Sequence, residues 1–104
     1  MNDFIDLTGA SGVRYRFRHW PEGASHLPMA GNFAYVRAEA AGFTVLVLGE
    51  SANLSEARAD WASAARQGAT HVFTRLNVSR ATRTGEHADL AAAYAKARLM
   101  ESAD

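Results

Sequence analysis

The sequence predicts a single α+β domain, residues 1–104, in which a small, mostly antiparallel or mixed β-sheet has two helices packed on it. The length of 104 residues, with 48% hydrophobic and 21% charged residues, is that of one compact domain. Short β-prone runs joined by tight turns fill the first half of the chain, and helical spacing enters only later. The expected order of elements is therefore β-β-β-β-α-β-α.

The first two strands are expected to form an N-terminal hairpin within residues 1–30. Residues 13–19 alternate between apolar and basic side chains, and a period of two places all the basic ones on one sheet face. Glycines at both ends of residues 9–12 predict a tight turn, which makes residues 4–7 the partner strand. Residues 21–28, bounded by prolines, predict a loop. The basic residues of this strand are Arg14, Arg16 and Arg18.

Later segments supply a second hairpin, two helices and one more strand. The apolar runs at residues 33–36 and 43–48 are expected to pair with each other. Asn53, with Glu56 three residues later, resembles a capping box and predicts a helix that continues to Gly68. Residues 70–76 predict a strand. The last helix can begin near Ser79 and is clearest over residues 86–100.

Composition excludes several classes of function. The chain has no cysteine, so disulfide scaffolds, thiolate metal sites and cysteine nucleophiles are excluded. Eleven basic residues balance eleven acidic ones, so a charged partner must be recognised by a local patch. The N-terminus lacks the basic and apolar regions of a signal peptide, and the longest apolar run, residues 45–48, is far below the roughly 20 residues of a membrane span. A cytoplasmic protein without membrane contact is expected.

Three segments resemble motifs of the GIY-YIG nuclease superfamily, in particular its small bacterial members. Residues 31–36 look like the first tyrosine motif, residues 47–54 like the second motif with its helix start, and residues 86–90 like the acidic motif of a late helix. Residues 68–72 are also similar to this group. The resemblance covers residues 31–94, and it implies a GIY-YIG-like core extended by the N-terminal hairpin and loop of residues 1–30.

The resemblance also implies where the catalytic residues would lie. Active relatives use one tyrosine from each short motif and a helix arginine around the scissile phosphate; here Phe33 and Val47 occupy the tyrosine positions. Arg58 lies one residue beyond the arginine position, about 100° around the helix. Tyr35, two residues after Phe33, shares its strand face and could supply a hydroxyl. The losses at these positions predict a catalytically impaired domain.

The acidic motif would hold the single divalent metal of an active relative. Counting back from Asp89 places His87 at the ligand position and Glu86 beside it. No cofactor is expected for an impaired domain, whereas Mg²⁺ or Mn²⁺ would be required by an active one. Histidines elsewhere lack the helical i, i+4 pairing of a metal site.

The arginine-rich strand is the candidate nucleic-acid-binding surface. Its arginines could follow a phosphate chain while nearby aromatic rings stack on bases. The arginines outside this strand that could join them are Arg37, Arg75, Arg80 and Arg83. The alternative is a solvated strand face, neutralised across the hairpin by Asp3 and Asp6.

Three hypotheses remain open at this point. The first is an impaired GIY-YIG-like domain that binds DNA, RNA or a protein partner through the sheet face and the helix after Gly49. The second is an active metal-dependent endonuclease that uses Tyr35, Arg58 and Glu86 in shifted geometry. The third is a purely structural or regulatory interaction module whose arginines never contact phosphate.

Overall fold

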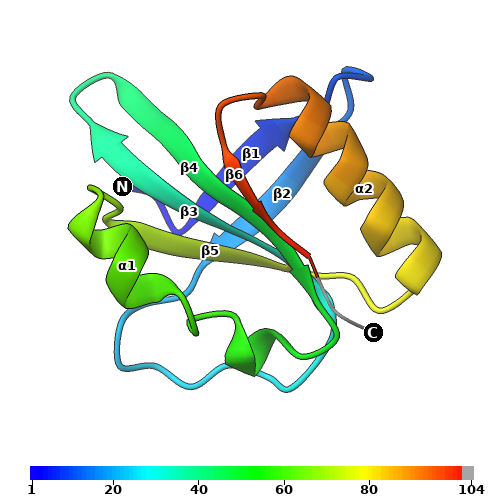
Figure 1. Cartoon of the computed structure of the whole chain (residues 1–104), viewed down its shortest axis with the longest axis horizontal. Helices are drawn as coiled ribbons and strands as arrows, with labels where there is room; N and C mark the ends of the chain where they lie inside the picture. Colours follow the sequence, from blue (N-terminus) through cyan, green and yellow to red (C-terminus); the bar gives the residue numbers. More distant parts are fainter. Residues whose placement is uncertain (102–104) are drawn as a thin grey trace.

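The computed structural model describes residues 1–101 and confirms the α+β class (Figure 1). Two helices, a short 3₁₀ helix and six strands make up this part of the chain. The strands are β1 (Phe4–Thr8), β2 (Arg14–His19), β3 (Gly31–Glu39), β4 (Gly42–Ser51), β5 (His71–Leu76) and β6 (Arg98–Met100). The helical elements are the 3₁₀ helix η1 (Leu54–Glu56), α1 (Trp61–Arg66) and α2 (Arg80–Ala93).

All six strands belong to one mixed sheet in the order β1-β2-β5-β3-β4-β6. Both predicted hairpins are present, because β1 pairs with β2 and β3 pairs with β4 in antiparallel fashion. Strand β5 lies between the two hairpins and is antiparallel to both of its neighbours. Its seam with β2 is short and consists of the register pairs Arg18–Thr74 and His19–Phe73.

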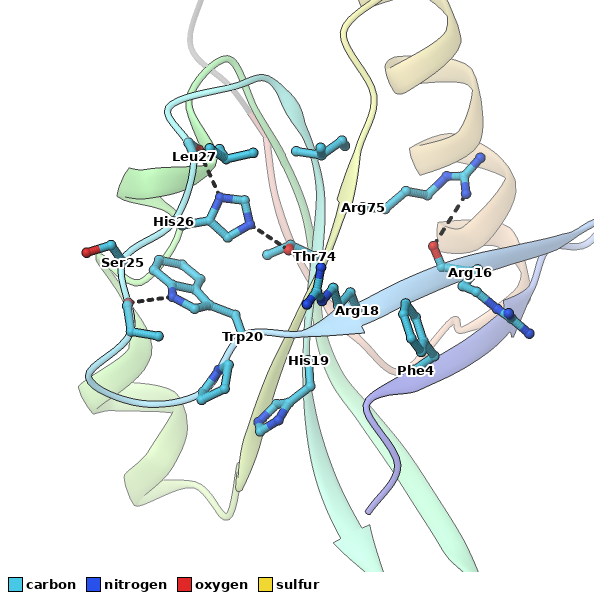
Figure 2. A pocket seen from close by; sticks show the side chains of 13 residues that line it. Phe4, Arg16, Arg18, His19, Trp20, Ser25, His26, Leu27, Thr74 and Arg75 are labelled. Atoms are coloured by element: carbon cyan, nitrogen blue, oxygen red, sulfur yellow. Dashed lines mark hydrogen bonds between the residues drawn. The ribbon is translucent and has the colours of Figure 1, made fainter.

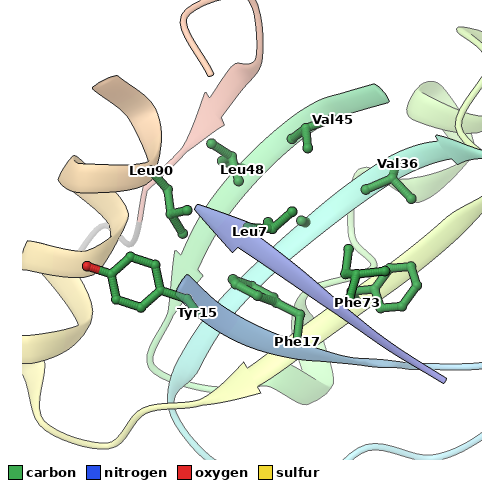
Figure 3. Packing of buried hydrophobic residues seen from close by; sticks show 10 residues of the cluster. Leu7, Tyr15, Phe17, Val36, Val45, Leu48, Phe73 and Leu90 are labelled. Atoms are coloured by element: carbon green, nitrogen blue, oxygen red, sulfur yellow. The ribbon is translucent and has the colours of Figure 1, made fainter. Parts of the chain in front are cut away.

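The sheet curls, so that side chains of the N-terminal hairpin meet those of β3 and β4 on the inner face (Figure 3). Leu7, Phe17 and Phe73 are fully buried in this inner cluster. Helix α2 closes the cluster by inserting Leu90. The alternation along β2 follows from this packing, because Tyr15 and Phe17 point inward while the three arginines that alternate with them point outward.

The outer face of the sheet is covered only in part. Side chains from β3, β4 and β5 form a second buried cluster beneath η1 and α1. No helix among residues 1–101 lies over the outward side of β1 and β2, where all three β2 arginines are exposed (Figure 1). The predicted basic face of β2 is therefore not covered by a helix of residues 1–101. The members of the outer cluster are Trp20, Phe33, Tyr35, Val47, Leu54, Ala57, Ala64, Ala69 and Val72.

The predicted continuous helix from Asn53 to Gly68 is wrong. Asn53 does cap a helical turn, since its side chain accepts from the amide of Ser55, but this turn is the 3₁₀ helix η1. The carbonyl of Ala57 accepts a hydrogen bond from the Tyr35 hydroxyl, and the amide of Trp61 donates to Arg58 instead. A bond from strand β3 thus replaces the helical bond between Ala57 and Trp61. Helix α1 begins only after this break.

The predicted extent of the last helix is also wrong at its C-terminal end. Ser79 caps α2 through a bond from the Thr82 amide, as the earlier of the two predicted starts requires, but α2 ends at Ala93. Residues 98–100 then form β6, which is parallel to Val47–Gly49 of β4. Residues 98–100 thus pair with the free edge of β4 instead of continuing the helical pattern of the alanine-rich residues before them. None of the helices in residues 1–101 has the length and apolar character needed to cross a membrane.

Candidate functional site

A groove of about 490 Å³ lies on the outward side of the N-terminal hairpin (Figure 2). Strand β2 forms its floor, the loop of residues 21–28 forms one wall, and the end of β5 contributes Thr74 and Leu76. Phe4 of β1 lies at the opposite side from the loop. Two of the three arginines of β2, Arg16 and Arg18, line the groove, so the structure combines the predicted basic face with a concave surface.

The arginines of the groove differ in their partners. Arg18 lies between Phe4 and Thr74 (Figure 2) and has no ion-pair partner among residues 1–101. Arg16 lies 3.2 Å from the Asp6 carboxylate, with 66% and 39% of the two side chains exposed. Such an exposed pair contributes little stability and is easily exchanged for another anion. The predicted neutralisation by Asp6 therefore holds for Arg16 and not for Arg18.

Among the other predicted arginines, Arg75 lines this groove but is engaged with a carboxylate, and Arg14, Arg37 and Arg83 lie outside it. Arg14 is exposed at the far end of β2, and Arg37 on β3 pairs with Glu39 at 3.2 Å. Arg75 lines the groove, but its Nε lies 2.8 Å from a Glu86 carboxylate oxygen. Arg83 is buried, so it cannot contact a surface ligand. Within residues 1–101, Arg37, Arg75 and Arg83 are therefore paired or buried and do not extend the basic face of β2.

Hydrogen bonds fix the loop wall of the groove. The indole of Trp20 donates to the carbonyl of Ala24 at 2.8 Å. His26 Nδ1 lies 2.8 Å from the Leu27 carbonyl, which can only accept, so this nitrogen carries the proton. In the neutral ring, Nε2 then accepts from the Thr74 hydroxyl at 2.7 Å. These bonds join the loop to β5 and preform the concave surface without a ligand.

Arg58 lies behind this wall rather than in the groove. Its guanidinium lies 4.4 Å from the centre of a Trp20 ring and 5.5 Å from a Trp61 ring, and Nη2 donates to the Trp20 carbonyl. Burial lowers the pKa of Arg58 below its ordinary value. The role that this geometry supports is positioning of Trp20.

The positions that correspond to the short tyrosine motifs are buried in the outer cluster. Phe33, Tyr35 and Val47 lie together there, and all three are almost completely inaccessible to solvent. The Tyr35 hydroxyl donates to the Ala57 carbonyl, and burial raises the pKa of Tyr35 to about 12. Arg58 is close by, across Trp61. The structure thus brings these four residues close together, and three of them are core residues of the outer cluster.

Glu86 and His87 are on α2, which packs on the inner face of the sheet. Glu86 accepts hydrogen bonds from Arg75 and from the Asn77 side chain at 2.8 and 2.9 Å. His87 is buried, with Nε2 3.6 Å from the Glu101 carboxylate. Within residues 1–101, no three histidine, aspartate or glutamate side chains are placed to hold a metal ion. The predicted metal ligands are therefore separated from the motif residues by the sheet.

Comparison with protein-family models, with curated proteins and with solved structures found no match to this chain.

Sequence reasoning missed most of the groove. Phe4, His26, Leu27 and Leu76 line it together with Thr74, and none of them was a candidate. The signal that could have found Phe4 is the period-two pattern of β1, which places it opposite Arg18 in the hairpin register. No local signal joins His26 to Thr74, because 48 residues separate them.

A histidine pair at the edge of the groove predicts a pH-dependent stability. The rings of His19 and His71 have centroids 5.1 Å apart. Burial lowers the pKa of His19 below 6.5, and the charge of His71 lowers it further while Asp3 opposes this; burial also lowers the pKa of His71. The folded state therefore disfavours both protonated rings, and the unfolded chain takes up protons first as the pH falls.

We expect the free energy of unfolding to be at its full value above about pH 6.5 and to decline as the pH falls from there through the lower folded-state pKa values. Urea unfolding at pH 7.5, 6.5 and 5.5 measures this decline. The double variant His19→Gln/His71→Gln should show a flatter profile over the same range. Identical profiles for the double variant and the parent chain would contradict the expectation.

Proposed function

We propose that this domain binds nucleic acid through the groove on its N-terminal hairpin and does not cleave it, as an impaired relative of the GIY-YIG nucleases. The observation that carries the proposal is Arg18, an arginine without an ion-pair partner in residues 1–101, in the middle of a preformed groove. A cation in a concave site is a ready partner for phosphate, because the guanidinium offers several donors in a fixed plane. Arg16 can add a second contact by releasing Asp6.

The charge distribution supports a local mode of binding. The chain as a whole is neutral, so long-range attraction to a polyanion is weak and the affinity must come from contacts within the groove. The exposed apolar side chains of the same groove suit the uncharged parts of a nucleotide. Phosphate contacts of this kind give an affinity that falls as the salt concentration rises.

The buried motif positions support binding without hydrolysis. Hydrolysis needs an activated water molecule and donors placed around the phosphate. The Tyr35 hydroxyl is engaged with Ala57, and Phe33 and Val47 carry no polar group at all. Arg58 is held between two indole rings. The side chains of Phe33, Tyr35 and Val47 are almost completely buried, so these positions are not open to a phosphodiester.

An Arg18→Ala variant tests the proposal. We expect it to bind a fluorescently labelled oligonucleotide about tenfold more weakly than the parent chain at low salt, and to lower the slope of affinity against salt by about one phosphate contact. Fluorescence anisotropy between about 50 and 200 mM salt measures both quantities. Arg66→Ala is the matched control, because it removes the same charge from an exposed position on α1 outside the groove.

Two results would count against the proposal. Equal affinities of the Arg18→Ala variant and the parent chain would refute binding through the groove. Cleavage of the oligonucleotide in Mg²⁺ or Mn²⁺ by the parent chain, abolished in an Arg58→Ala variant that is still folded, would instead support the active-nuclease hypothesis.

A further inference from the structure

We infer that the groove is built for an unpaired strand, with one base stacked on Phe4 and a neighbouring phosphate held by Arg18. This inference rests on the proposed function and specifies the class of nucleic acid. Phe4 and Arg18 are directly opposite each other in the β1–β2 register. Directly opposed side chains on one face of an antiparallel pair are close neighbours, so a stacking ring and a phosphate anchor lie side by side on the groove floor.

Three apolar residues that line the groove are exposed to solvent. Phe4 is 46% exposed, Leu76 is 49% exposed and Leu27 is 57% exposed, and all three line the same concavity as the arginines. Scattered exposed apolar residues are normal on a protein surface. Here three of them share one groove with Arg18, so the groove offers both apolar contacts and a positive charge. A nucleotide has the same two parts, a flat apolar base and an anionic phosphate.

The arrangement of Phe4 favours an unpaired base over a paired one. Proteins that bind single strands combine a positively charged groove with aromatic side chains on which bases stack. In a duplex the faces of the bases are already stacked on each other, and only their edges are accessible in the grooves. Against a duplex, the Phe4 ring would face sugar and phosphate groups, and the exposed apolar residues of the groove would bury little apolar surface. A cavity of about 490 Å³ also has the size of a small-molecule site, which suits single nucleotides.

Arg16 strengthens the stacking position. Its guanidinium carbon lies 5.5 Å from the centre of the Phe4 ring, so the ring is already oriented by a cation–π contact before a ligand arrives. A preoriented ring loses less conformational freedom on binding than a freely rotating one. Arg18, which has no ion-pair partner within residues 1–101, remains available on the other side of Phe4, toward Thr74 (Figure 2).

The experiment compares one labelled oligonucleotide of mixed sequence as a single strand and as a duplex with its full complement. For the parent chain we expect tighter binding of the single strand. Phe4→Ala should weaken binding of the single strand by about 5- to 150-fold, which corresponds to the loss of one base–aromatic stack, and should leave duplex binding unchanged. Phe4→Trp should retain the affinity for the single strand. Because Phe4 is half exposed, these variants are expected to fold, and circular dichroism verifies this.

Val13→Ala is the matched control, since Val13 is a similarly exposed apolar residue of the same hairpin that lies outside the groove. Two outcomes overturn the inference: the duplex binds as tightly as the single strand, or Phe4→Ala weakens both forms equally or neither. If Arg18→Ala still weakens binding in these cases, the proposed function stands while the inference fails. Failure of the parent chain to bind either form at low salt overturns both.

Discussion

Replacing Arg83 with methionine is expected to lower the free energy of unfolding by about 3–5 kcal/mol, because it leaves a buried carboxylate without its cation. Arg83 Nε lies 3.9 Å from Glu50 Oε1, and the two side chains are only 5% and 9% exposed. Arg83 also donates from Nη1 to the carbonyl of Val78 at 3.1 Å. After the substitution, the Glu50 carboxylate keeps, among residues 1–101, the bond from Thr84 at 2.9 Å.

Urea unfolding of the single variants and of the double variant Glu50→Gln/Arg83→Met completes a double-mutant cycle. The double variant should be more stable than Arg83→Met alone, since the uncompensated charge is gone. Arg66→Met, at an exposed helix position, controls for the loss of an arginine as such. A loss below about 1 kcal/mol in Arg83→Met would mean that the pair is as weak as an exposed one.

Replacing Gly49 with alanine is expected to destabilise the domain by about 1–3 kcal/mol or more through overpacking. A Cβ atom at Gly49 would overlap the ring of Phe33. This ring extends from β3 and is buried in the outer cluster. The ring cannot move aside freely, because Tyr35 lies beside it with a centroid separation of 5.6 Å. Gly49 therefore leaves the space that the Phe33 ring occupies.

A compensating substitution tests this explanation of the Gly49→Ala effect. Phe33→Leu/Gly49→Ala should lose less stability than the sum of its two single variants, since the leucine leaves space for the new methyl group. Gly85→Ala is the control, because nothing lies within 4 Å of that Cβ position within α2, and alanine there should raise stability by roughly 0.5–1 kcal/mol. Thermal unfolding followed by circular dichroism measures all four variants. Strict additivity of the Phe33 and Gly49 substitutions would argue against a direct steric conflict.

Strands β1 to β5 were predictable because their signals are local. The alternation in residues 13–19 reports one buried and one solvated face, and the structure has both. The break between η1 and α1 was not predictable, because it depends on a hydroxyl from Tyr35, 22 residues before Ala57. Strand β6 was missed for a similar reason: its pairing with β4 lies in the tertiary structure, whereas the helical propensity of its alanine-rich approach is visible in the sequence.

Of the candidate site, only the charged residues could be predicted from the sequence. Alternation alone placed Arg16 and Arg18 on one face, and the proximity of Arg16 to Asp6 followed from the hairpin. The sequence could not indicate that Trp20 turns onto the outer face and that His26 is bonded to Thr74, although these contacts create the wall of the groove. Hydrophobic patterning reports which residues are buried, but not where a loop folds back to form a concavity.

The groove spans the short seam between β2 and β5, where few backbone pairs join the N-terminal hairpin to the rest of the sheet. Phe4 and Arg18 belong to the hairpin side of this seam, whereas Thr74 and Leu76 belong to the main sheet. A molecule that touches both sides fastens the hairpin to the sheet and so adds to the few backbone pairs that hold them together. Thermodynamic linkage is reciprocal, so a change that weakens the contact between the hairpin and the sheet also lowers the affinity for that molecule. Ligand binding and the pairing of β2 with β5 therefore stabilise each other.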